Sequence, residues 1–179
     1  NEGVKQRLGG LHSARLVLYS VDFAEIEALQ AQGEWVRAGM LLADAARSLK
    51  AAGAEGLVIC TNTMHKVASA IEAVGLPLIH IADATATVIQ AQGLKRIGLL
   101  GTRFTMEQKF YAGRLERYGL QVLTPDEAGR EQVHRIIYEE LCLGQIREES
   151  RQIYRDIMAD LVAQGAEGII LGCTEIGLL

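Results

Sequence analysis

Short runs of Val, Ile and Leu alternate along the chain with longer segments in which apolar residues recur at helical spacing. Short continuous apolar runs are typical of strands that are buried on both faces of a sheet. This pattern predicts strands at residues 14–19, 57–59, 78–81, 97–100, 120–123 and 169–171. It predicts helices at residues 36–52, 65–74, 85–92, 106–118 and 150–164.

The alternation of strand and helix predicts an α/β fold with mainly parallel sheets flanked by helices. In such folds ligands bind beyond the carboxyl ends of the strands. A glycine follows several predicted helices, where a left-handed residue commonly ends the helix. We expect this conformation at Gly53, Gly75, Gly93, Gly119 and Gly165.

One heptapeptide occurs twice, as GAEGLVI at residues 53–59 and as GAEGIIL at residues 165–171. Such a repeat predicts two pseudo-symmetric lobes with a cleft between them. We expect residues 1–92 to form the first lobe, residues 93–165 the second, and residues 166–179 a strand and turn that complete the cleft. Counting from each copy pairs Thr61 with Cys173. If the first strand continues that far, Cys60 points to the opposite face from Thr61.

Composition narrows the classes of function. The net charge of -4 is spread along the sequence without basic runs, so we expect no nucleic-acid partner. No apolar run is long enough to cross a membrane, and the three cysteines lack zinc-ligand spacing, which together favour a cytoplasmic, metal-free protein. No nucleotide-binding or pyridoxal signature occurs. The chain begins with Asn1 and stops soon after a predicted strand, so we expect pieces of the natural protein to be missing at both ends.

Two segments that follow predicted strands resemble the signature motifs of the cofactor-independent aspartate/glutamate racemase family. They are TNTMH at residues 61–65 and GCTE at residues 172–175. The family motifs read Cys-Asn-Thr-x-His and Gly-Cys-Thr followed by Glu in aspartate-type members or His in glutamate-type members. The resemblance covers essentially the whole chain and implies racemisation of an acidic amino acid, with Glu175 on the aspartate side.

By this resemblance Thr61 and Cys173 are the catalytic pair, and Thr61 stands where the family has its first cysteine. An alternative alignment gives that role to Cys60. The family transfers a proton between two side chains on opposite faces of the substrate, and a helix N-terminus would lower the pKa of the thiol. Because a hydroxyl is harder to deprotonate than a thiol, Cys173 should be the better base. The resemblance to glutamate racemase implies that the second cysteine faces the α-hydrogen of the L enantiomer, so L substrates should be preferred.

Other residues are expected to bind substrate. The resemblance and the donors available after each strand indicate Gln30, Asn62, Thr63, Thr102, Thr174 and Glu175. Gln30 has a second interpretation as a solvated helix residue, and Thr102 as a helix cap. Aspartate-specific members often place an Arg near Gln30 and a Lys near Cys142, and this chain lacks both cations, so a broader substrate range is open.

Two other functions fit the same residues. A single working cysteine would suit a decarboxylase or isomerase of small diacids. Loss of half the acid/base pair would suit a non-catalytic amino-acid binding protein. For the racemase we expect a small-molecule amino-acid substrate, no membrane partner, no cofactor and a homodimer.

Overall fold

The structure is a computed structural model that describes residues 1–179. The chain divides into two compact units. Unit 1 comprises residues 1–57 and 67–78, and unit 2 comprises residues 58–66 and 79–179. The lobe boundaries expected from the repeat, at residues 92 and 165, differ from the boundaries of these two units. The division into lobes stays a prediction.

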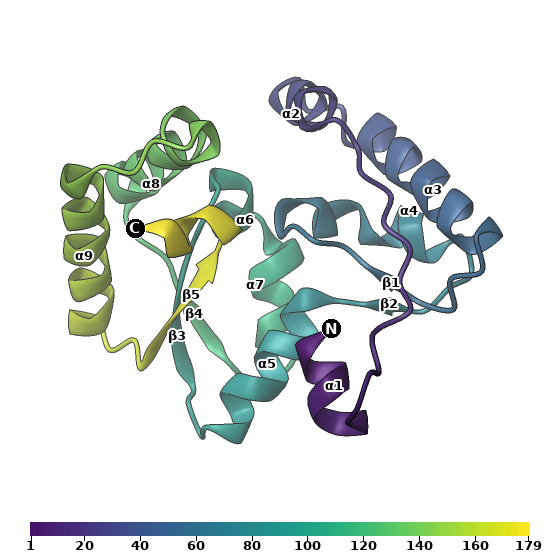
Figure 1. The fold of residues 1–179 in the computed structure, drawn as a ribbon. Helices are drawn as coiled ribbons and strands as arrows, with labels where there is room; N and C mark the ends of the chain where they lie inside the picture. The colour runs from purple at the N-terminus through teal and green to yellow at the C-terminus, as the bar shows by residue number, and fades with distance from the viewer. The chain divides into compact units, whose positions relative to one another are not determined.

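Helices dominate unit 1 (Figure 1). Helix α3 packs against α2 and α4, and a Cβ added at Gly39 of α3 would lie 3.2 Å from the Cβ of Ala70 in α4. Two short strands, β1 and β2, pair to form a two-stranded sheet, and the first residue of each strand belongs to this unit. The elements are α1 (Glu2–Leu8), α2 (Phe23–Ala31), α3 (Trp35–Ala51), β1 (Leu57–Val58), α4 (Ala68–Glu72) and β2 (Leu78–Ile79).

Unit 2 is built around a parallel sheet in the order β4-β3-β5. Figure 1 shows α8 and α9 on one side of these strands and α5 and α7 on the other. The elements are η1 (Thr63–Val67, whose last residue belongs to unit 1), α5 (Ile81–Ala91), β3 (Arg96–Gly101), α6 (Arg103–Glu107), α7 (Lys109–Glu116), β4 (Gln121–Leu123), α8 (Glu127–Glu139), η2 (Leu141–Leu143), α9 (Glu148–Ala163), β5 (Gly168–Gly172) and η3 (Thr174–Leu178).

The sheet of unit 2 has an apolar core on each face. Leu100 of β3 packs with α8 and α9, whereas its neighbour Leu99 packs with α5 and α7, and both side chains are fully buried. Successive strand residues point to opposite faces, so a strand covered by helices on both sides is apolar throughout. This three-layer arrangement confirms the α/β class that the alternation predicts.

The two copies of the repeat form the same turn. Gly53 and Gly165 have φ angles of 90° and 97°, which is the left-handed region expected of them. The next residue in each copy bonds back to the preceding helix, from Ala54 N to Leu49 O at 3.0 Å and from Ala166 N to Leu161 O at 2.9 Å. The same predicted conformation is confirmed at Gly75, Gly93 and Gly119. Each copy then enters a strand, β1 or β5.

The prediction of a strand at residues 14–19 is wrong in this structure. The segment has no ladder partner, and Leu16 and Leu18 are 72% and 75% exposed. An apolar run becomes a strand only where a neighbouring strand satisfies its backbone groups, and β1 and β2 pair with each other alone.

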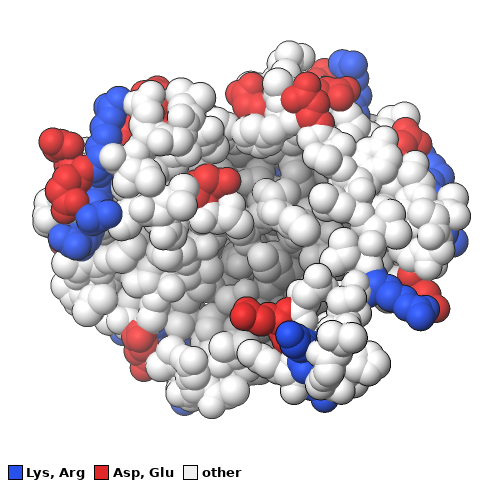
Figure 2. Space-filling view, viewed as in Figure 1, with Lys and Arg blue, Asp and Glu red and all other residues white.

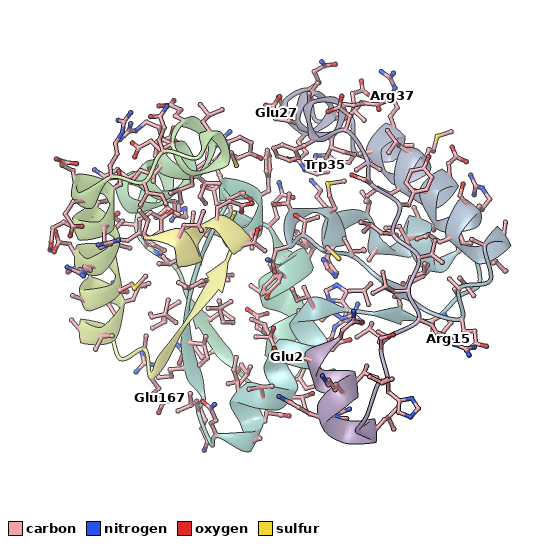
Figure 3. The ribbon with its side chains drawn as sticks, in the orientation of Figure 1. Glu2, Arg15, Glu27, Trp35, Arg37 and Glu167 are labelled. Carbon is pink, nitrogen blue, oxygen red and sulfur yellow. The ribbon has the colours of Figure 1, made fainter.

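No helix is both long and apolar enough to span a membrane. On the face drawn in Figure 2, Lys and Arg lie among Asp and Glu and do not gather into a basic patch.

Candidate functional site

Three loop segments of unit 2 meet at the carboxyl end of its sheet. Gly101, the last residue of β3, is in register with Gly172, the last residue of β5. Thr102 follows the first of these glycines and Cys173 follows the second. The loop after β1 reaches the same place, because the Thr63 hydroxyl lies 3.0 Å from the Thr102 hydroxyl. This is the edge at which parallel α/β sheets bind ligands.

The three hydroxyls at this edge form a closed cluster. Thr63 Oγ1 lies 3.4 Å from Thr105 Oγ1, and Thr102 Oγ1 lies 3.3 Å from Thr105 Oγ1. All three residues are buried. Thr102 also caps α6, since its Oγ1 accepts a hydrogen bond from Thr105 N at 3.4 Å. The cap role considered for Thr102 is therefore confirmed, and it does not exclude a substrate contact.

Close backbone packing supports this arrangement. A Cβ at Gly172 would lie 2.7 Å from the backbone oxygen of Leu100, and one at Gly101 would lie 3.1 Å from the oxygen of Gly172. A side chain at either position would push β3 and β5 apart. Both glycines therefore let the two strands deliver Thr102 and Cys173 at close range.

Cys173 is engaged with a carboxylate. Its Sγ donates a hydrogen bond to Oε2 of Glu175 at 2.8 Å, and Thr174 Oγ1 donates to the same oxygen at 2.8 Å. Burial, followed by the hydrogen bond and the negative charge of Glu175, raises the pKa of the Cys173 thiol. The expected lowering at a helix N-terminus is not found, because the thiol is buried and lies against the Glu175 carboxylate at the start of η3, a single short 3-10 segment.

The carboxyl group of Glu175 shows the complementary shift. Burial by itself would raise its pKa, but the hydrogen bonds from Cys173 and Thr174 hold the pKa below its ordinary value. The ground state therefore has the proton on sulfur and the negative charge on Glu175. The two groups share one proton at short range, which is the arrangement of a coupled acid/base pair.

The side chain of His65 forms hydrogen bonds that hold the TNTMH segment in place. Thr61 is exposed, whereas Asn62, Thr63 and His65 are buried. His65 Nδ1 lies 2.8 Å from the carbonyl oxygen of Thr61, and its Nε2 accepts a hydrogen bond from Ile81 N at 3.3 Å.

The choice between Thr61 and Cys60 stays open, since both are exposed. Strand β1 ends at Val58, so the strict alternation of side chains does not reach either residue. Thr61 and Cys173 occupy equivalent positions after the two copies of the repeat. Thr61 is also the residue whose carbonyl oxygen accepts from His65.

Two further residues were considered from the sequence, Gln30 and Cys142. Gln30 is in α2 of unit 1 and only 4% exposed, so its interpretation as a solvated residue is wrong. Cys142 is exposed on η2, which packs against η3, and burial and the charge of Glu175 raise its pKa. A neutral thiol thus lies near the place where the resemblance would put a lysine.

Two features of the site were missed by the sequence. One is the place of Thr105 in the hydroxyl cluster, although its spacing of three residues from Thr102 returns it to the same side of one helical turn. The contact between Cys173 and Glu175 spans two residues in a turn, a geometry that no regular periodicity predicts. No cluster of three or more His, Cys, Asp or Glu side chains is placed to hold a metal ion.

Comparison with known proteins gives one consistent family. The sequence model described as "Asp/Glu/Hydantoin racemase" matches residues 1–179. A solved structure of a candidate Asp/Glu racemase from Yersinia pestis is 65% identical and superposes with a TM-score of 0.91, covering 100% of this chain and 79% of the other. An aspartate racemase homologue from Pyrococcus horikoshii OT3 is 35% identical, with a TM-score of 0.80 over 99% of this chain and 77% of the other.

A further relative is an uncharacterised protein from the pnlA 3′ region of Pectobacterium carotovorum subsp. carotovorum. It is 33% identical over 102 residues, which are 57% of this chain and 67% of the relative.

Proposed function

Because the chain belongs to the Asp/Glu/hydantoin racemase family, we propose that it racemises an acidic amino acid by proton transfer at Cα between Cys173 and Thr61, without a cofactor. The observation that carries the proposal is the contact of the Cys173 thiol with Glu175 at the carboxyl edge of the sheet. An exposed hydroxyl at Thr61 supplies the second proton-transfer group in the same unit.

The proposed step with an L substrate keeps every proton accounted for. The thiol proton of Cys173 passes to Oε2 of Glu175, and the thiolate removes the α-hydrogen as a proton. The electron pair of the broken C–H bond stays on Cα and spreads into the α-carboxylate. Thr61 then gives its hydroxyl proton to the opposite face of Cα and regains one from Glu175 through solvent, which restores both groups.

The two directions of this reaction differ in their first step. Cys173 has a carboxylate in direct contact that can take its proton, although burial and that carboxylate raise the pKa of the thiol. A threonine hydroxyl gives up its proton far less readily, so attack on the α-hydrogen of a D substrate is slow. We therefore propose that Cα–H removal is much faster from L than from D substrates.

Substrate binding is assigned to groups around the same edge. The hydroxyls of Thr63 and Thr102 and the amide of Asn62 are donors for the α-carboxylate, with Thr174 beside them. Glu175 has a second carboxylate oxygen, Oε1, that suits the α-ammonium group of an amino acid. Donors that sit ready for a carboxylate also stabilise the negative charge that develops there as Cα loses its proton.

Aspartate and glutamate are the proposed substrates. The Yersinia pestis protein is described as an Asp/Glu racemase candidate and the Pyrococcus horikoshii protein as an aspartate racemase homologue. Cys142 near Glu175 is neutral, so no cation at this position restricts the substrate to one side-chain length. A cytoplasmic homodimer is part of the proposal, and light scattering of the full-length protein tests the oligomeric state.

Isotope exchange tests the reaction. The full-length protein is incubated with L- and D-aspartate and L- and D-glutamate in deuterated water, beside Cys173→Ala, Thr61→Ala and Cys60→Ala variants. We expect deuterium at Cα and formation of the opposite enantiomer, with both lost in Cys173→Ala and inversion lost in Thr61→Ala. Loss of inversion in Cys60→Ala, with Thr61→Ala active, would transfer the role to Cys60. Absence of exchange in every sample would contradict the racemase and favour a diacid lyase or a binding protein.

A further inference from the structure

The side chain of His65 bridges the proposed acid/base residue Thr61 and the first turn of α5. It is 2% exposed and uses both ring nitrogens, Nδ1 toward the Thr61 carbonyl at 2.8 Å and Nε2 toward Ile81 N at 3.3 Å. The backbone of the same turn is closed by a hydrogen bond from His65 N to Asn62 O at 3.0 Å. The imidazole therefore links the turn at Thr61 to the first residue of α5.

These partners define the protonation of the ring. The amide of Ile81 can only donate, so Nε2 must be the unprotonated acceptor. The carbonyl of Thr61 can only accept, so Nδ1 must carry the hydrogen. Only the neutral ring with its hydrogen on Nδ1 makes both bonds at once. A protonated ring would lose the bond from Ile81.

The surroundings of His65 favour this neutral form. Ile81 begins α5, and the amino end of a helix repels positive charge. His80, the N-cap of α5, lies with its ring centroid 4.3 Å from that of His65 and accepts from Ala82 N through its own Nδ1. Burial lowers the pKa of both rings, most strongly for His80.

The charged groups that face the two rings are Arg114 from α7 and Asp83 from α5. They bind each other through two hydrogen bonds of 2.7 Å, so their opposite charges largely cancel at the rings. Neither group offers His65 a counter-ion of its own.

We propose that His65 is a positioning residue for the racemase, which holds the Thr61 main chain against α5 so that the Thr61 hydroxyl meets Cα. The inference rests on the proposed function of Thr61. A displacement of about 1 Å in a reacting group costs up to about a hundredfold in rate. Acidification removes the tether, because the protonated ring cannot accept from Ile81.

Two replacements in the full-length protein separate positioning from simple packing. His65→Leu keeps bulk and removes both hydrogen bonds, whereas His65→Gln keeps one donor and one acceptor and cannot titrate. For racemisation of L-aspartate we expect kcat to fall by about ten- to a hundredfold in His65→Leu with KM nearly unchanged. We expect His65→Gln to recover most of kcat and to lose less activity than the wild type as the pH falls well below the ordinary histidine pKa of about 6.5, since burial lowers the pKa of His65.

Activity is expressed per folded molecule, with the folded fraction taken from circular dichroism. Wild-type kcat in His65→Leu on that basis would overturn the proposal, as would equal loss in the Leu and Gln variants. A second readout does not need activity. The carbonyl ¹³C resonance of Thr61 should titrate together with the ring nitrogens of His65, and independent titration of the two would also overturn it. If the wild type shows no racemisation while these resonances move together, the proposed function fails and the tether stands.

Discussion

The Sγ of Cys173 and Oε2 of Glu175 lie 2.8 Å apart, with the hydrogen on sulfur and the charge on the carboxylate. Only one of the two groups is negative at neutral pH, because two negative charges at this distance repel each other strongly. The proton can nevertheless move between them without any change in net charge. Burial and the Glu175 carboxylate keep the resting thiol protonated, so the thiolate that the proposed reaction needs forms only during turnover.

Glu175→Gln tests this exchange of a proton. Gln keeps the length and an oxygen that accepts from Cys173, but it can neither take the thiol proton nor repel a thiolate. We expect the rate of Cα–H exchange of L-aspartate to fall by about a hundredfold or more. We also expect the pKa of Cys173, followed by thiolate absorbance in the ultraviolet, to move down toward its ordinary value. Glu139→Gln, at an exposed position, is the charge-matched control.

The two readouts of Glu175→Gln separate two roles. If exchange becomes faster as the thiol pKa falls, Glu175 merely suppresses the thiolate and is not its proton acceptor.

Acid should destabilise the protein through His80. Burial, then the neighbouring His65 and Arg114, lowers the pKa of His80 from 6.5 to about 4. Between about pH 6.5 and pH 4, His80 is protonated in the unfolded chain but not in the folded chain. Stability is therefore full above about pH 6.5 and declines toward pH 4, by on the order of 3 kcal/mol at about 1.4 kcal/mol per unit of pKa.

Urea unfolding between pH 7 and about pH 4 measures this loss. His80→Asn keeps an acceptor for the helix amide at Ala82 and cannot titrate, so its stability should fall less steeply with acid. His12→Asn, at an exposed histidine, should follow the wild type. Equal pH dependence in all three proteins would show that His80 does not carry the effect.

Gly172→Ala should weaken both the fold and the site. The new methyl group would lie 2.7 Å from the backbone oxygen of Leu100, which cannot turn aside as a side chain can. We expect a loss of about 1–3 kcal/mol in the free energy of unfolding and a lower rate of exchange, because Cys173 moves with the strand end.

Gly113→Ala in α7 is the matched control, since its new Cβ would lie at an ordinary 3.6 Å from the Cβ of Lys109. Helix propensity predicts a gain of up to about 1 kcal/mol there. If chemical denaturation gives the two variants the same stability, the close approach of β3 and β5 is not as tight as described.

Local sequence patterns predicted the parts of the fold that depend on local physics. The apolar run at residues 97–100 became the central strand β3, and both copies of the repeat gave a left-handed glycine before a strand. The run at residues 14–19 is also rich in apolar residues but pairs with no strand, because pairing depends on a neighbour that composition does not reveal.

The candidate site shows the same division. The motifs around Thr61 and Cys173 were found from sequence, as was the hydroxyl at Thr102. The pKa of Cys173 was expected to fall and instead rises, because burial raises it and the Glu175 side chain turns toward the thiol. That orientation is decided by packing and by the Thr174 hydroxyl, which no spacing rule contains.

The two copies of the repeat end in unlike residues, and this has a thermodynamic consequence. The enantiomers of an amino acid have equal free energy in water, so the equilibrium constant is unity whatever the catalyst. Values of kcat/KM for the two directions of inversion must therefore be equal, even with a threonine at one strand end and a cysteine at the other. Faster removal of the α-hydrogen from L substrates must therefore appear as internal return. In internal return an L substrate loses its α-hydrogen to Cys173 and recovers a solvent hydrogen on the same face. Such a protein labels L amino acids faster than it inverts them.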